Sequence, residues 1–286
     1  MQGDFEFQIN GMPHRVAGVP AGLSLIEFLR DNLLTSVKDS CGAGGCGACS
    51  VLLADRDASG EPAFRAVNAC QMTLPMVAGR ELWTAEALVE GERPHPVVEQ
   101  LEGAAGHACG HCLPGVCMSL CEAYESGREL LAGEAIGQTI GNLCRCTGYQ
   151  PFRDALIVSL RDRAKEGGSP TALAERLPKR FSGVAPMAYR DREGAVFYRP
   201  ATSLEALRLR HAHPEARLVA GGTSRGWTGA GEEESAGAAT RLISLEAVAE
   251  LGGFSRDDER WTVGAGAVSY THLTLPTIVR ECRSRW

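Results

Sequence analysis

The sequence contains no uninterrupted apolar run long enough to cross a membrane, although 44% of its 286 residues are hydrophobic. Its first residues, Met-Gln-Gly-Asp-Phe-Glu, lack the basic region and the apolar segment of a signal peptide. An excess of positive charge is also missing, because the formal net charge is −6, and this argues against a nucleic-acid partner. These absences predict a chain that works in the cytoplasm, away from membranes and nucleic acids.

Cysteine, by contrast, is abundant, with eleven residues in the chain. A secreted disulfide scaffold would use cysteine as heavily, but it would need a signal peptide. Because the cysteines fall in clusters, reduced thiols that bind a metal are the favoured interpretation. The length also exceeds that of an average domain, so we expect two or three domains.

The first cysteine set surrounds a glycine-rich loop at residues 39–50. Cys41, Cys46 and Cys49 have four and two residues between them, and Cys70 follows after twenty more. This spacing is typical of plant-type [2Fe–2S] ligation. The glycines let the backbone wrap closely round a small anionic cluster and turn N–H groups toward its sulfurs. A structural zinc site is the alternative, although such sites usually combine two C-x2-C pairs.

The sequence around this loop predicts a β-grasp ferredoxin fold over residues 1–83. A tight turn is expected at Asn10-Gly11. Ser24 and Glu27 form a capping box for a helix. Its apolar face would carry Leu25, Phe28, Leu29 and Leu33. The expected strands are 5–9, 16–19, 50–54 and 63–70.

The second cysteine set consists of Cys109-Gly-His-Cys112 and Cys144-Arg-Cys146. Four helices are expected around it, at about 95–105, 114–126, 134–141 and 151–165. Two of them begin at a proline, so each cysteine pair would lie at a helix N-terminus, where the dipole favours thiolates. The pattern predicts a four-thiolate site inside a four-helix bundle over residues 84–165. Taken alone, this set fits zinc about as well as iron, and the ferredoxin-like first loop favours iron.

Both sets, with Gly141-Asn-Leu-Cys-Arg-Cys-Thr-Gly-Tyr149, resemble the iron–sulfur portion of the xanthine dehydrogenase family of molybdenum hydroxylases. The resemblance covers roughly residues 3–165. It implies that Cys41, Cys46, Cys49 and Cys70 hold one [2Fe–2S] cluster. It implies that Cys109, Cys112, Cys144 and Cys146 hold another, which faces the molybdopterin. Cys117 and Cys121, four residues apart on an expected helix, are interpreted as buried structural residues, and Cys282 is left without a role.

Three residues near Cys109 depart from the family pattern. Ala108 stands where the family usually has a glutamine that contacts the molybdenum cofactor. His111 and Leu113 stand where it usually has an aromatic residue and a threonine. The departures concern the contact with the molybdenum partner and leave the cluster ligands intact. His111 is a candidate hydrogen-bond donor to a cluster sulfur, with a plain surface or packing histidine as the alternative.

The third region follows a predicted linker at residues 166–192. A helix is expected from Thr202 or Ser203 to His213-Pro214, and a strand at 217–220. The strand leads into a glycine turn that could cradle a phosphate. Residues 193–268 resemble the start of the family's FAD-binding (PCMH-type) domain, assigned here to 193–286. The resemblance implies a FAD-binding segment made of Leu218, Val219, Ala220, Gly221, Gly222, Thr223 and Ser224. Because it ends after about residue 268, we expect a truncated domain that binds FAD poorly.

The resemblance implies an α+β chain that is the small subunit of a xanthine dehydrogenase. Electrons from a molybdopterin on a separate large subunit would pass through both clusters to FAD and then NAD during hypoxanthine or xanthine oxidation. The chain would transfer electrons within a hetero-oligomer and carry no catalytic residue for the purine. One alternative is the iron–sulfur subunit of an aldehyde, carbon monoxide or isoquinoline oxidoreductase. The other is a zinc-stapled binding module.

Overall fold

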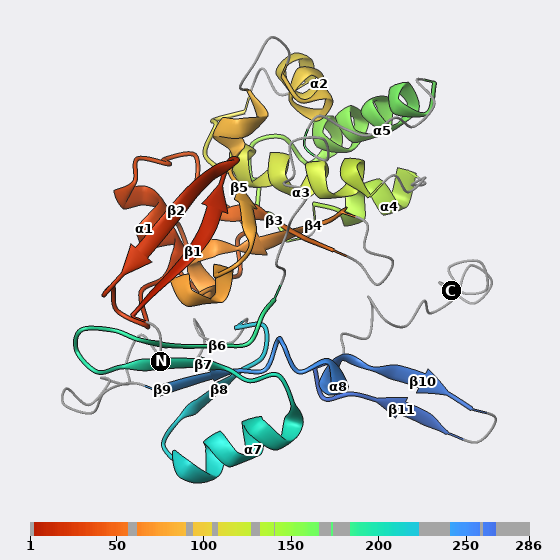
Figure 1. Ribbon diagram of the computed structural model, residues 1–286. Coiled ribbons are helices and arrows are strands. Elements are labelled where there is room, and N and C mark those ends of the chain that lie inside the picture. Colours follow the sequence, from red (N-terminus) through yellow and green to blue (C-terminus); the bar gives the residue numbers. More distant parts are fainter. Residues whose placement is uncertain are drawn as a thin grey trace.

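The computed structural model describes residues 3–56, 62–89, 94–104, 108–126, 132–139, 141–165, 173, 184–222, 241–257 and 260–266. These residues form three parts: a five-stranded sheet with one helix, a group of helices, and a second sheet (Figure 1). The helices lie on one side of the five-stranded part and the second sheet on the other (Figure 1). Within the described ranges, every helix is too short or too polar to span a bilayer.

The first sheet has the strand order β2-β1-β5-β3-β4. Only the β1–β5 pairing is parallel. The tight turn between β1 and β2 is confirmed, because Asn10 and Gly11 have φ angles of 54° and 80°. Helix α1 (Leu25–Asp31) begins at the predicted capping box of Ser24 and Glu27. The strands are β1 (Asp4–Ile9), β2 (Met12–Ala17), β3 (Ser50–Arg56), β4 (Pro62–Asn68) and β5 (Glu81–Trp83).

Strand β3 is buried on both faces, which ties the first part to the helices. Val51 and Leu53 belong to the same apolar core as α1. Leu52 and Ala54, which point to the opposite face, belong to the core shared with the helical part. The sheet therefore lies between α1 and the helices, and the cysteine loop that precedes β3 emerges at their junction.

The four predicted helices of the second part are confirmed to within a few residues. They are α2 (Pro96–Ala104), α3 (Leu113–Glu125), α4 (Ala132–Gly137) and α5 (Gln150–Lys165). Helix α3 packs against β3 and β4, and α5 packs against the other three helices. The predicted burial of Cys117 and Cys121 on α3 is also confirmed, with 7% and 0% exposure.

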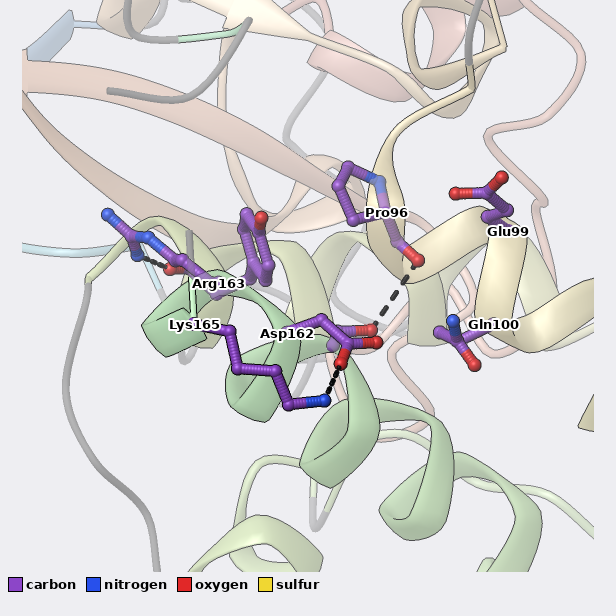
Figure 2. Close-up of a pocket in the computed structure, with 8 residues that line it drawn as sticks. Pro96, Glu99, Gln100, Asp162, Arg163 and Lys165 are labelled. Carbon is purple, nitrogen blue, oxygen red and sulfur yellow. Dashed lines mark hydrogen bonds and ion pairs between the residues drawn. The ribbon is translucent and has the colours of Figure 1, made fainter. Parts of the chain in front are cut away.

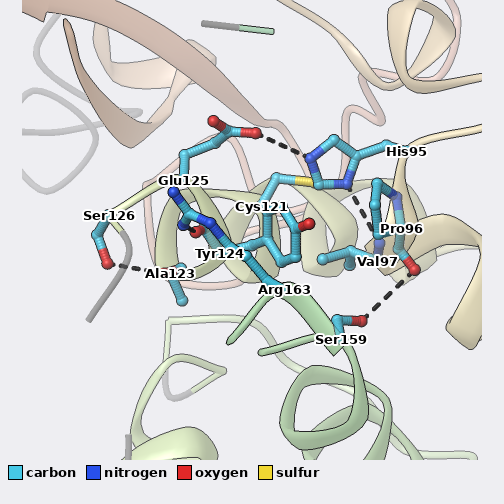
Figure 3. Close-up of polar contacts among 10 residues, drawn as sticks. All are labelled: His95, Pro96, Val97, Cys121, Ala123, Tyr124, Glu125, Ser126, Ser159 and Arg163. Atoms are coloured by element: carbon cyan, nitrogen blue, oxygen red, sulfur yellow. Dashed lines mark hydrogen bonds and ion pairs between the residues drawn. The ribbon is translucent and has the colours of Figure 1, made fainter. Parts of the chain in front are cut away.

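A buried polar network joins α3 to the start of α2 (Figure 3). The backbone N–H of Val97 donates to His95 Nδ1 at 3.2 Å. His95 Nε2 therefore carries the proton and donates to Glu125 Oε1 at 3.0 Å. Cys121 Sγ lies 3.5 Å from the same Nδ1. Burial raises the pKa of Cys121 well above its ordinary value, so this thiol stays protonated and acts as a packing group.

The third part contains a four-stranded sheet of order β6-β7-β9-β8 and a short hairpin, β10–β11. Helix α7 (Ser203–Ala212) begins with Thr202 as its cap and ends at His213, as predicted. The remaining elements are β6 (Met187–Arg190), β7 (Val196–Arg199), β8 (Arg217–Val219), β9 (Arg241–Ser244), α8 (Ala249–Gly252), β10 (Phe254–Arg256) and β11 (Trp261–Val263).

Four expectations from the sequence are wrong in detail. The strand expected at 16–19 forms earlier in the chain, as β2 (Met12–Ala17). Residues 187–190 were assigned to the linker but form β6, because Tyr189 is buried against the first part. Leu33 lies beyond the end of α1, with a φ of 64° and 83% exposure, so it is absent from the apolar face of the helix. Cys70 lies in the 3-10 helix η1 (Ala69–Gln71) and not in a strand, because β4 ends at Asn68.

Arg199 holds the third part to the first. Its guanidinium is 2% exposed and donates to the carbonyl oxygens of Met76 and Ala78 at 3.2 and 2.9 Å. Elsewhere along this boundary, Tyr189 Oη donates to Val19 O at 2.6 Å. These contacts fix the third part beside the region that carries Cys70.

Candidate metal centres

The four thiols of the first set meet as two pairs. Electrostatic interactions between the thiols link Cys49 with Cys70 and Cys46 with Cys41. Cys49 is buried, Cys46 and Cys70 are half-buried, and Cys41 is exposed. The predicted ligands of the first cluster are therefore brought together, with Cys41 at the outer edge.

Two amide side chains hold the first loop in place. Asn68 Nδ2 donates to Gly44 O at 3.0 Å, and Gln71 Nε2 donates to Gly42 O at 3.1 Å. Gln71 Nε2 also lies 3.3 Å from Cys70 Sγ. The sequence analysis missed both amides, although each lies within two residues of Cys70.

The two thiols of the Cys49–Cys70 pair have very different pKa values. The pKa of Cys70 is lowered to about 6, chiefly by the hydrogen bond from Cys49 and further by one from Gln71. The same Cys49–Cys70 bond, together with burial, raises the pKa of Cys49 far above its ordinary value. Because the thiolate is the form that binds metals, Cys70 is already prepared for ligation.

The second set also forms two pairs. Electrostatic interactions between the thiols link Cys109 with Cys146 and Cys112 with Cys144. Cys109 and Cys146 are exposed, Cys144 is half-buried, and Cys112 is buried. Burial raises the pKa of Cys112 to about 12. One side of this set thus faces solvent and the other faces the protein core.

Local structure supports these positions. Cys112 is the residue that precedes α3, so its pair lies at a helix N-terminus as predicted. Cys144 and Cys146 precede α5, which begins at Gln150, one residue before the expected start. The backbone N–H of Cys144 donates to Tyr149 Oη at 2.8 Å, and Thr147 Oγ1 lies 3.3 Å from Cys144 Sγ.

The number of cysteines in each set fits a binuclear cluster. A [2Fe–2S] cluster takes four cysteines, and each iron binds two of them. The residues present therefore fit two such clusters. The pairs would be Cys41 with Cys46, Cys49 with Cys70, Cys109 with Cys146, and Cys112 with Cys144.

The two sets are joined by direct backbone contact. The N–H of Leu143, which precedes Cys144, donates to the carbonyl oxygen of Cys46 at 2.8 Å. Asn142 Nδ2 donates to Gly47 O at 3.0 Å, and Ser119 Oγ of α3 donates to Asn142 Oδ1 at 2.7 Å. Gly115 also belongs to this junction, because a Cβ there would collide with Gly47 O. The contacts of Gly47 with Gly115 and Asn142, together with the bond from Leu143 to Cys46, are called the seam below. The Gly-Asn-x-Cys sequence motif thus builds the junction between the sets.

The predicted FAD-binding segment is described only in part. Leu218, Ala220 and Gly221 are exposed, Val219 is buried, and Thr223 and Ser224 lie outside the described residues. Gly222 approaches the first set, since a Cβ there would lie 2.7 Å from Gln71 O. The segment that leaves β8 therefore abuts the residue after Cys70.

A shallow cleft of about 240 Å³ lies between α2 and α5 (Figure 2). Lys165 and Asp162 form an ion pair of 2.7 Å at its edge, and Arg163 lies over the ring of Tyr124. None of the cysteines lines this cleft. Its charges neutralise one another, so we assign it no ligand.

Comparisons with known families match all three parts of the chain. The "2Fe-2S iron-sulfur cluster binding domain" family matches residues 7–75, and the "[2Fe-2S] binding domain" family matches residues 84–157. The "FAD binding domain in molybdopterin dehydrogenase" family matches residues 189–284. The two cluster domains and the FAD-binding domain expected from the sequence are thereby confirmed, in the expected order. The FAD-binding match reaches residue 284, so the expectation that the resemblance ends after about residue 268 is wrong.

Individual relatives include xanthine- and aldehyde-oxidising enzymes. Xanthine dehydrogenase 1 of Arabidopsis thaliana is 30% identical over 275 residues, which cover 76% of this chain and 20% of the relative. Abscisic-aldehyde oxidase of the same plant is 38% identical over 160 residues, covering 53% of this chain and 12% of the relative. The chain therefore spans a fifth or less of these relatives.

A solved structure shares this arrangement. The aldehyde oxidoreductase of Desulfovibrio gigas matches with 30% identity and a TM-score of 0.50, covering 60% of this chain and 18% of that one. With three matching domains in sequence order, paired cysteines in both cluster domains and relatives of one kind, the chain belongs to the xanthine dehydrogenase-type molybdenum hydroxylase family, whose iron–sulfur and FAD-binding domains it carries.

Proposed function

We propose that this chain is the electron-transfer subunit of a xanthine dehydrogenase. It carries electrons from a molybdopterin site on a partner subunit to FAD and then to NAD while hypoxanthine or xanthine is oxidised. The observation that carries the proposal is the unbroken series of contacts from the second cysteine set, through the first set, to the segment after β8.

The exposed edge of the second set is the proposed entry point. Cys109 and Cys146 face solvent, and Leu143 beside them is 63% exposed. Exposed sulfur ligands beside an apolar side chain fit a surface that a protein partner covers. His111 is exposed as well, so a partner that covers Cys109 would also contact His111.

The seam between the sets is the proposed internal link. Each bound [2Fe–2S] group would supply one-electron redox chemistry. One main-chain hydrogen bond, from the N–H of Leu143 to the carbonyl oxygen of Cys46, connects the two ligand sets. Asn142 and Gly115 hold this link rigid, because both are packed against Gly47.

The exit lies on the opposite side of the first set. Cys70 is followed by Gln71, whose carbonyl faces Gly222 at the end of the β8 segment. This segment is the one proposed to hold FAD. Arg199, which binds the carbonyls of Met76 and Ala78, keeps the third part against this side of the first set.

An aldehyde-oxidising enzyme is the second candidate. It is favoured by the 38% identity to abscisic-aldehyde oxidase and by the match to the Desulfovibrio gigas aldehyde oxidoreductase. Coverage of the third part does not separate the two candidates, because aldehyde oxidase 2 of Cavia porcellus matches 91% of this chain and xanthine dehydrogenase 1 matches 76%. The substrate assay described below separates them. The zinc-stapled module is disfavoured, because both cysteine-bearing domains match families that bind [2Fe–2S] clusters.

Metal content and spectroscopy test the electron-transfer role. The chain, purified or reconstituted without oxygen, should contain about four irons and little zinc. Reduction should then give two distinct paramagnetic signals. Stoichiometric zinc in a colourless protein would rule out the electron-transfer role.

Partner and substrate are tested together. The tagged chain should co-purify with a molybdenum-containing subunit, and the complex should reduce NAD with xanthine as the donor. Reduction by an aldehyde and not by xanthine would select the second candidate. A location in the cytoplasm belongs to the proposal, because the ten cysteines in the described part are all free thiols.

A further inference from the structure

Gln71 joins three features of the first cysteine set. It directly follows Cys70, and only 3% of it is exposed. Its Nε2 lies 3.3 Å from Cys70 Sγ and 3.1 Å from the carbonyl oxygen of Gly42. Both neighbours accept hydrogen bonds, so the amide NH₂ group, and not the amide oxygen, must face them.

Two glycines leave the space that Gln71 occupies. A Cβ at Gly44 would lie 2.8 Å from Gln71 Cγ, so any larger residue would displace the side chain. On the other side, a Cβ at Gly222 would lie 2.7 Å from Gln71 O. The residue is thus held between the cysteine loop and the third part of the chain, with its donor aimed at one sulfur ligand.

We propose that Gln71 is a positioning residue that raises the reduction potential of the first cluster by donating a hydrogen bond to Cys70 Sγ. An N–H group directed at a cysteine sulfur offsets its negative charge. Reduction adds one electron to a cluster and makes it more negative, so the donor stabilises the reduced form more than the oxidised form. The inference rests on the proposed electron-transfer function and deepens it, because the residue lies on the side that faces the FAD-binding segment.

The test compares redox titrations of the full chain loaded with iron and sulfide. Gln71→Met keeps the length of the side chain but removes the donor, and Gln71→Glu replaces the amide with an acceptor of the same shape. Gln100→Met, on α2 in a cleft that contains no cysteine, is the matched control. The paramagnetic signal lost in Cys70→Ala identifies the first cluster.

At a fixed applied potential, Q71M should lower the ratio of reduced to oxidised first cluster by at least about threefold. For a one-electron couple this is about 30 mV. Q71E should lower it further. The second cluster and the Q100M control should stay unchanged, at equal iron content.

An unchanged potential in Q71M with full iron content would overturn the proposal. If Q71M loses the first cluster, Q71E carries the same test. Equal shifts in the reduction potentials of both clusters would also overturn the proposal, because a general structural change would then be responsible. Failure of the proposed function looks different, since the unaltered chain would then bind no iron.

Discussion

The backbone N–H of Leu143 donates to the carbonyl oxygen of Cys46 at 2.8 Å. Cys46 is a proposed ligand of the first cluster, and Leu143 directly precedes Cys144, a proposed ligand of the second. The two cysteine sets come from separate parts of the chain, yet one hydrogen bond connects their ligands. Substitutions in the seam around this bond are therefore expected to change both the stability of the fold and electron transfer between the two sets.

Replacing Gly115 with alanine should disturb this seam. Its Cβ would collide with Gly47 O, so α3 must move away from the cysteine loop. We expect a loss of roughly 1–3 kcal/mol in the free energy of unfolding, as for other overpacked sites. Gly103→Ala on α2, where nothing lies within 4 Å, should be neutral or stabilising. Urea denaturation measures both, and equal stabilities would contradict the seam's tight packing.

Replacing Cys70 with alanine should halve the iron content. The chain should fall from about four irons to about two, because one four-cysteine set is broken. Cys117→Ala is the control, since Cys117 is buried in α3 and belongs to neither set. Iron analysis after anaerobic reconstitution distinguishes them. Full iron in Cys70→Ala would remove Cys70 from the ligand set.

Replacing Glu86 with glutamine should change how stability depends on pH. Glu86 accepts hydrogen bonds from the N–H and hydroxyl of Ser36, near the start of the cysteine loop. Burial opposes ionisation, but the bonds from Ser36 outweigh it, so the pKa of Glu86 is lowered from 4.5. The carboxylate therefore stabilises the fold above pH 4.5, and this contribution is lost as the pH falls through the lower folded value.

The Glu86→Gln variant should accordingly be less stable than the unaltered chain at pH 6–7, and the difference should shrink below about pH 4. Thermal unfolding across this range checks the expectation. A difference that stays constant with pH would show that the charge of Glu86 has no role.

Replacing Arg199 with methionine should loosen the third part. The variant leaves the carbonyls of Met76 and Ala78, and the Glu246 carboxylate, without this partner. Glu246 keeps its ion pair with Arg80, so the cost comes from the two carbonyl oxygens that lose this donor, about 1–3 kcal/mol each. Arg208→Met is the control, because Arg208 is exposed on α7. Limited proteolysis should cleave the Arg199 variant faster than the Arg208 variant between α5 and β6, the stretch that leads into the third part. Equal cleavage of both variants would contradict the role of Arg199.

Local patterns in the sequence predicted the elements well. The Ser24–Glu27 capping box and the Asn10-Gly11 turn depend on short-range chemistry, and both form as expected. Cysteine spacing likewise predicted a ligand set around the first loop, because cluster ligation imposes a fixed number of residues between ligands. The burial of Cys117 and Cys121 followed from their positions on one helix face.

Long-range contacts were beyond such patterns. Strand β6 is stabilised by packing against the first part, and its short sequence gave no periodic signal. The role of Gln71 depends on contacts with Gly42, Gly44 and Gly222, which lie far from it in the sequence. The domain boundaries and the ligand assignments stay predictions that the experiments above can test.

The junction at Gly47 and Gly115 is main chain against main chain, and Asn142 adds a side-chain hydrogen bond to Gly47. Substitutions in side chains that make no contact with this junction can therefore accumulate over evolutionary time without altering how far apart the two redox centres sit. Homologous enzymes could in this way adjust the driving force at each centre, or exchange one docking surface for another, while the tunnelling distance remains constant.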